Sequence, residues 1–176
     1  MEALAQFFKS QEFINVQPPI LTSSDCEGGG EAFQVLTSSP SKQDDHFFNR
    51  PVFTTVSSQL HLEFLASGMS RVYTIGPCFR AEPSNSTRHL AEFWMLEAEI
   101  AFITDLDHLV DFIEAQIKFV IKYLLDYHAE DLQFFNQFIE KGLVEKLTKM
   151  VDEPFARITY TDAIDALLKV KDKEWR

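Results

Sequence analysis

The stretch RVYTIGPCFRAEPSNSTRHLAEFWMLEAEIAFI, residues 71–103, decides the fold. Two segments that alternate between apolar and polar residues flank a short polar loop, and this pattern is typical of an antiparallel hairpin. We expect the arms of the hairpin at about residues 72–82 and 92–103 and its turn at residues 83–88.

The two faces of the second arm differ in character, because side chains two residues apart in a strand share a face. We expect the core face to carry Trp94, Leu96, Ala98, Ile100 and Phe102. The opposite face carries Phe93, Met95, Glu97 and Glu99, and pairing across the hairpin would bring Cys78, Arg80 and Glu82 beside it. This polar face is either a solvated strand surface with cross-strand ion pairs or a binding surface. Arg88 and His89 add cationic donors at the end of the loop, and a ring among charges suits stacking, so we favour binding.

The hairpin resembles a known motif. FRAE (79–82) followed by RHLAEF (88–93) resembles motif 2 of the class II aminoacyl-tRNA synthetases. RHLAEFWMLEAE (88–99) resembles its asparaginyl form, within the subclass shared with the aspartyl and lysyl enzymes. The resemblance implies an α+β fold, with an antiparallel sheet flanked by helices. It also implies that residues 1–176 are a partial catalytic domain, with the end of motif 1 in FFKSQEFINVQPPIL (7–21) and with motif 3 and the anticodon-binding domain outside this segment.

The resemblance implies that five hairpin residues bind ATP. Arg80 is the expected catalytic residue, since it would hold the α-phosphate and neutralise the charge that builds there as the amino-acid carboxylate attacks. Glu82 would accept hydrogen bonds from the adenine side, and Phe93 would stack on the ring. Arg88 or His89 would reach the outer phosphates.

Four further residues are expected to bind the amino acid, namely Glu27, Gln59, Glu97 and Glu99. Glu27 lies in the Gly-rich SSDCEGGGEAFQV (23–35), which on composition alone predicts a flexible loop but resembles the mobile loop that closes over the substrate. Gln59 falls where the family holds the amino end of the substrate. Glu97 can accept from an amide NH₂, and Leu62 stands where aspartyl enzymes place a lysine, so the site should prefer asparagine to aspartate.

The resemblance also implies function and partners. It implies an asparagine-tRNA ligase that uses ATP to activate asparagine as the adenylate and then transfers it to tRNA(Asn). Mg²⁺ would have its ligands C-terminal to this segment, and the motif 1 region would form a homodimer. Two alternatives stay open. One is a non-catalytic truncated product or paralogue that acts through dimerisation, and the other is an aspartyl-tRNA synthetase or a tRNA-independent amide-forming relative.

Composition limits these possibilities. A net charge of -11 argues against binding nucleic acid by electrostatics alone, so much of the tRNA contact should come from elsewhere. No apolar run is long enough for a membrane span, and the N-terminal residues show no targeting pattern, so we expect the cytoplasm or the mitochondrial matrix. The two cysteines, Cys26 and Cys78, and five scattered histidines predict neither a disulfide framework nor a metal site.

Periodicity predicts the remaining elements. We expect helices at residues 2–10, 58–67, 104–128, 131–150 (interrupted at Gly142) and 161–169, and strands at 13–20, 52–56 and 157–160. In the second helix Leu60, Phe64 and Leu65 should face the core, and Thr104 with Asp107 should form a capping box at the start of the third.

Overall fold

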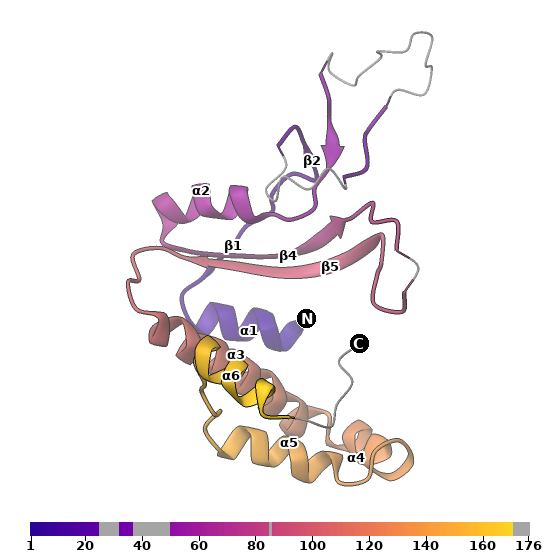
Figure 1. Cartoon of the computed structure of the whole chain (residues 1–176), viewed down its shortest axis with the longest axis vertical. Coiled ribbons are helices and arrows are strands. Elements are labelled where there is room, and N and C mark those ends of the chain that lie inside the picture. Colours follow the sequence, from indigo (N-terminus) through magenta and orange to yellow (C-terminus); the bar gives the residue numbers. More distant parts are fainter. Residues whose placement is uncertain (25–31, 37–49, 85, 171–176) are drawn as a thin grey trace. The chain divides into compact units, whose positions relative to one another are not determined.

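The computed structural model describes residues 1–24, 32–36, 50–84 and 86–170 (Figure 1). The chain divides into two compact units, Met1–His108 and Leu109–Arg176. The first unit contains both sheets and the first two helices, while most of the second consists of helices.

The predicted hairpin forms in the first unit. Strands β4 (Arg71–Phe79) and β5 (Glu92–Ile100) pair antiparallel, with Cys78 opposite Phe93 and Thr74 opposite Glu97. Residues 80–82 and 101–103, which we expected within the arms, lie beyond the ends of these strands. The hairpin therefore forms as the alternating pattern predicts, with shorter arms.

A third strand makes this sheet mixed. Strand β1 (Ile14–Asn15) pairs with β4 in parallel, which gives the order β1-β4-β5. The expected antiparallel pairing therefore holds for β4 and β5, and the parallel pairing of β1 was not expected. Between β1 and β4 the chain passes through helix α2, and a crossover of this kind brings a strand back in the same direction. Strands β2 (Leu21–Thr22) and β3 (Phe53–Thr54) form a separate antiparallel pair.

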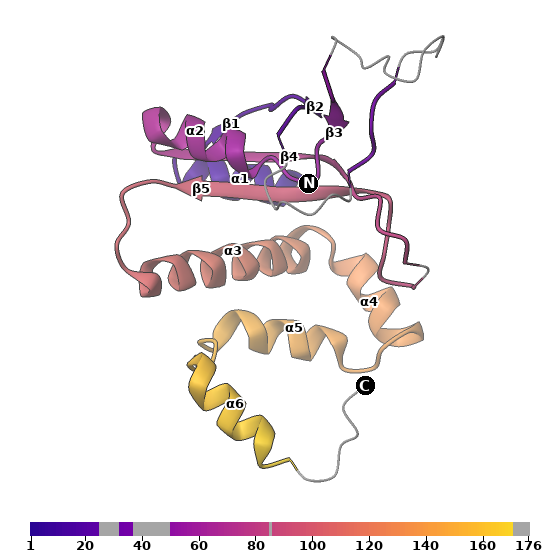
Figure 2. The same cartoon turned by 45° about the horizontal axis from the view of Figure 1, so that its top comes forward.

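Helices α1 (Glu2–Ser10) and α2 (Gln59–Met69) lie on opposite sides of the β4–β5 pair, as Figures 1 and 2 show. On one side the ring of Phe8 stacks on Tyr73, with ring centroids 4.4 Å apart. On the other side Leu62 and Ala66 pack on Val72 in a buried cluster. Because neighbouring residues of a strand point to opposite faces, Val72 and Tyr73 anchor one helix each.

The distribution of core and surface differs from the prediction for the hairpin. The face expected to be polar is buried along β4, where Val72, Thr74 and Cys78 are all nearly inaccessible to solvent. On the face expected to be core, Trp94 is 65% exposed. Phe8 covers this face at Tyr73, which pairs with Ala98, and Trp94 lies four residues further along β5.

Helix α2 shows a second correction. Leu60 and Phe64, expected in the core, are exposed, and Phe64 is 78% accessible. Leu62 and Ala66 are buried instead, and Leu65 packs partly against them. Residues four apart form one stripe on a helix, and the stripe that meets the sheet starts at Leu62 rather than at Leu60.

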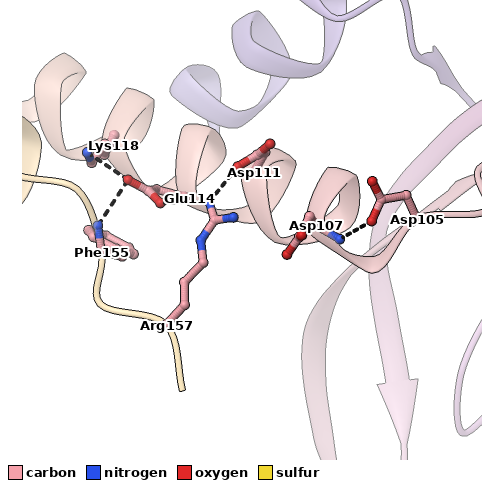
Figure 3. A network of polar contacts seen from close by, with 7 residues as sticks. All are labelled: Asp105, Asp107, Asp111, Glu114, Lys118, Phe155 and Arg157. Carbon is pink, nitrogen blue, oxygen red and sulfur yellow. Dashed lines mark hydrogen bonds and ion pairs between the residues drawn. The ribbon is translucent and has the colours of Figure 1, made fainter. Parts of the chain in front are cut away.

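The remaining helices are α3 (Leu106–Tyr127), α4 (Ala129–Phe138), α5 (Leu143–Asp152) and α6 (Tyr160–Leu168). The predicted break at Gly142 is confirmed, since this residue has φ 85° and separates α4 from α5. At the start of α3 the Asp105 carboxylate accepts from the Asp107 N–H at 2.8 Å, so Asp105 provides the cap that we expected from Thr104 (Figure 3).

The strand expected at residues 157–160 was wrong. Residues 157–159 are irregular, and the Thr159 hydroxyl accepts from the Asp162 N–H to cap α6. Figure 3 shows the side chain of Arg157 reaching Asp111 of α3, while the Phe155 N–H donates to Glu114 at 3.1 Å. These side-chain contacts hold the segment before α6 without a strand partner. No helix among the described residues is long and apolar enough to cross a membrane.

Candidate functional site

A pocket of about 520 Å³ opens where the hairpin strands give way to their loop. It is lined by Arg80, Glu82, Arg88, His89, Leu90 and Phe93. The structure thus brings together all five residues for which ATP contacts were predicted. The site begins where the hydrogen-bonded pairing of β4 and β5 ends, next to the bond from the Arg80 N–H to the Ala91 carbonyl at 3.0 Å.

Arg80 and Phe93 form one wall of this pocket. The guanidinium carbon of Arg80 lies 5.6 Å from the centroid of the Phe93 ring, within the range of a cation–π contact. The Nη1 atom of Arg80 lies 3.9 Å from Oε1 of Glu82, and both side chains are about one-third exposed. A cation and an aromatic ring therefore both line the pocket.

His89 holds the loop side of the pocket. Its Nε2 atom lies 3.3 Å from Oε2 of Glu82, and its Nδ1 atom lies 3.2 Å from the Ser84 hydroxyl. The Ser86 hydroxyl lies within hydrogen-bonding distance of the same nitrogen and also accepts from the Arg88 N–H at 3.2 Å. Glu82 therefore contacts both Arg80 and His89, and the serines orient the imidazole.

Glu97, on the same face of β5 as Phe93, meets the N-terminal end of α2. The Ser58 N–H donates to both of its carboxylate oxygens, at 2.8 Å to Oε2 and 3.1 Å to Oε1. The Ser57 hydroxyl donates to Oε1, and the Cys78 thiol lies 3.9 Å from Oε2. A helix N-terminus favours an anion, so this carboxylate is well placed at α2.

The other residues predicted to bind the amino acid lie less close together. Gln59 is exposed, and its side-chain amide donates to Glu63 at 3.0 Å rather than approaching Glu97. Glu99 shares the Glu97 face, and partial burial raises the pKa of its carboxyl, with further contributions from Glu63 and Glu97. Glu27 lies outside the described residues.

Sequence reasoning missed the partners of Glu97. The sequence indicated only that a helix begins near Ser58, and it placed Cys78 on the correct face without a contact to Glu97. The alternation of the strands does place Cys78 and Glu97 on one face, but nothing in the strand pattern indicates that a helix would end there. Among the described residues, no group of three His, Cys, Asp or Glu side chains is arranged to hold a metal ion.

Comparisons with known proteins show the family of the chain. The whole chain, residues 1–176, matches the family described as tRNA synthetases class II (D, K and N). It is 50% identical to a probable mitochondrial asparagine--tRNA ligase of Dictyostelium discoideum over 166 residues, which cover 94% of this chain and 36% of that protein. It is 48% identical to an asparagine--tRNA ligase of Clostridium botulinum (strain Eklund 17B / Type B) over 183 residues, with 98% of this chain and 39% of the relative covered.

A solved structure resembles the chain over the same extent. The asparaginyl-tRNA synthetase of Pyrococcus horikoshii, complexed with asparaginyl-adenylate, superimposes with a TM-score of 0.79 at 30% identity. This match covers 99% of the chain and 36% of the solved chain, so the chain spans less than two-fifths of the length of these relatives. Because the family match extends over all its residues, the chain belongs to the class II tRNA synthetases of the D, K and N group.

Proposed function

We propose that residues 1–176 form part of the catalytic domain of an asparagine-tRNA ligase. The enzyme would activate asparagine with ATP, releasing pyrophosphate, and would transfer the asparaginyl group to tRNA(Asn). The observation that carries the proposal is the single pocket that contains Arg80, Glu82, Arg88, His89 and Phe93. Relatives named asparagine--tRNA ligase, at 48% and 50% identity, support the choice of amino acid.

Arg80 would serve as the catalytic residue. Its guanidinium is accessible at the pocket wall, and a planar fork of donors matches the oxygens of a phosphate. When the asparagine carboxylate attacks the α-phosphorus, negative charge builds on the phosphate oxygens as pyrophosphate leaves. A fixed cation at that position stabilises the transition state more than the ground state, and this difference lowers the barrier.

The other four pocket residues would bind the nucleotide. Phe93 presents a ring on which adenine stacks, and Glu82 would accept a hydrogen bond from the adenine side. Arg88 and His89 lie on the loop, where cationic groups would reach the outer phosphates. Since Glu82 already contacts Arg80 and His89, binding of ATP would replace part of this contact set with contacts to the nucleotide.

Glu97 would select the amide side chain. A carboxylate accepts hydrogen bonds from an amide NH₂ and repels a second carboxylate. Leu62 is fully buried against Val72, on the same face of the sheet as Glu97. This position therefore supplies no cation to balance the side-chain charge of aspartate. Glu27, Gln59 and Glu99 would complete the amino-acid site.

Three further components belong to the proposal. Mg²⁺ would neutralise the outer phosphates, with ligands C-terminal to the residues given. The tRNA would be bound largely by other parts of the enzyme, because a net charge of -11 disfavours contact with phosphates. Helix α1 and strand β1, which contain the motif 1 resemblance, would contribute to a homodimer interface.

Aminoacylation tests the proposed function. A complete enzyme that carries this sequence should charge a tRNA(Asn) transcript with labelled asparagine in the presence of ATP and Mg²⁺. A tRNA(Asp) transcript with labelled aspartate serves as the matched control and should give no product. Charging of tRNA(Asp) with aspartate, and none of tRNA(Asn), would assign the chain to the aspartyl branch of the family instead.

A further inference from the structure

Glu97 is held by a short relay of hydrogen bonds from the first turn of α2. The Gln59 N–H donates to the Ser57 hydroxyl oxygen at 3.1 Å, and the Ser57 hydroxyl donates its proton to Glu97 Oε1. A hydroxyl carries one proton and two acceptor lone pairs, so these two bonds are compatible and fix the direction of the relay. The Ser58 N–H, at 2.8 Å from Oε2, can only donate.

This arrangement makes both oxygens of Glu97 hydrogen-bond acceptors. Oε1 accepts from Ser57 and Oε2 accepts from Ser58, with the Cys78 thiol next to Oε2. The serines and the cysteine are all buried, which limits competition from water at these bonds. Glu97 therefore has a fixed orientation, and the lone pairs that remain on its oxygens are available only to another donor.

We propose that Ser57 is a positioning residue that sets the preference of the site for asparagine over aspartate. The inference rests on the proposed function, in which Glu97 contacts the substrate side chain. Asparagine and aspartate have nearly the same shape, so a site distinguishes them by which atoms donate and which accept. By donating to Glu97, the Ser57 hydroxyl holds this carboxylate in one orientation. In that orientation the carboxylate can accept a hydrogen bond from an amide NH₂ of the substrate.

The donating role of Ser57 is separate from helix capping. Ser58 is the N-cap residue of α2, and its own side chain makes no capping bond. Ser57 accepts from the Gln59 N–H, which supports the helix, but its proton goes to Glu97 and contributes nothing to the cap. A variant that loses the hydroxyl should therefore change substrate choice as well as stability, whereas a purely structural serine would change stability alone.

The test is ATP–pyrophosphate exchange by a complete enzyme carrying this sequence, with asparagine and aspartate as the amino acids. We expect Ser57→Ala to lower the ratio of kcat/KM for asparagine to that for aspartate by about tenfold or more, because one hydrogen bond to a charged group is lost. The KM for ATP should stay unchanged. Ser57→Thr, which keeps the hydroxyl, should restore the parent ratio, and Ser57→Cys, a weaker donor, should give an intermediate ratio.

A matched control lies on the same helix. The Ser67 hydroxyl donates to the Phe64 carbonyl at 2.7 Å and has no bond to Glu97, so Ser67→Ala should leave the ratio unchanged. In a Glu97→Gln background, Ser57→Ala should have little further effect on the ratio, because the group that it positions has changed. If Ser57→Ala folds poorly, as thermal unfolding would show, the comparison of Ser57→Cys with Ser57→Thr and the parent still tests the inference, and equal ratios in these three would refute it.

The outcomes separate the two claims. A parent enzyme without asparagine-dependent exchange refutes the proposed function and this inference with it. An active parent whose ratio is the same in Ser57→Ala refutes the inference alone. Equal losses for both amino acids, together with a raised KM for ATP, would assign Ser57 a structural role and would also overturn the inference.

Discussion

Replacing Arg80 by alanine should slow adenylate formation by about a hundredfold or more, a loss of roughly 2.7 kcal/mol from the transition state. The stability cost should be small, because the side chain is about one-third exposed and its carboxylate contact to Glu82 is long, at 3.9 Å. The contacts of Arg80 to Glu82 and to the Phe93 ring contribute about 1 kcal/mol or less to stability. A large loss of rate with a nearly unchanged melting temperature is therefore the expected result.

Asparagine-dependent ATP–pyrophosphate exchange measures this rate without requiring tRNA. Arg80→Lys keeps the charge but loses the planar fork, so its rate should fall between those of the parent and Arg80→Ala. Arg50→Ala, which removes an exposed arginine outside the pocket, is the matched control and should retain the parent rate. Unchanged exchange in Arg80→Ala would refute the assignment of Arg80 to the α-phosphate.

Three further predictions concern the Phe93 ring, the core of α2 and the partly buried carboxyl of Glu99. Phe93→Ala should raise the KM for ATP about tenfold through lost stacking, while Phe64→Ala, at an exposed position outside the pocket, should not; equal KM values would contradict the stacking role. Leu62→Ala should cost about 2–5 kcal/mol of stability in thermal or urea unfolding, whereas Leu60→Ala, at a partly exposed position, should cost less than about 1 kcal/mol; similar costs would mean that the core stripe is misassigned. The pKa of Glu99 is raised in the folded chain, so this carboxyl favours folding below its unfolded pKa, and the contribution is lost as the pH rises through the folded pKa. In thermal unfolding, Glu99→Gln should therefore have a higher melting temperature than the parent at pH 7 and no such advantage near pH 4. The same difference at both pH values would contradict this assignment.

The sequence predicted the hairpin because alternation is a local property of the chain. The same alternation placed Cys78 and Phe93 on one face, and the register confirms this placement. The alternation of the strand residues does not determine which helix covers which face of the hairpin, because the helices come from segments distant in sequence. Leu62 and Ala66 of α2 turn the expected polar face into core along β4, and Trp94 is left exposed.

The two parts of the candidate site also differ in how well the sequence predicts them. The residues of the nucleotide pocket lie close together in sequence, at the end of one hairpin, so a motif of fourteen positions (80–93) contains all of them, and Leu90 alone among the six was not predicted. The amino-acid site depends on contacts between distant segments. Pairing of Glu97 with Ser57 joins residues 40 positions apart, and the turn of Gln59 toward Glu63 reflects a helical spacing that competes with the predicted substrate contact.

The irregular segment before α6 illustrates a further limit. A strand was predicted at residues 157–160, but the Arg157 side chain binds Asp111 and the Thr159 hydroxyl caps the next helix. Local propensity was therefore overridden by side-chain contacts that no pattern of two-residue alternation encodes.

The most direct test of the proposed function is amino-acid-dependent ATP–pyrophosphate exchange by a complete enzyme that carries this sequence, measured in parallel with asparagine and with aspartate. We expect exchange with asparagine, little with aspartate, and loss of the asparagine signal in Arg80→Ala. Exchange that depends on aspartate, or the absence of exchange with either amino acid in a folded enzyme, would contradict the proposed function.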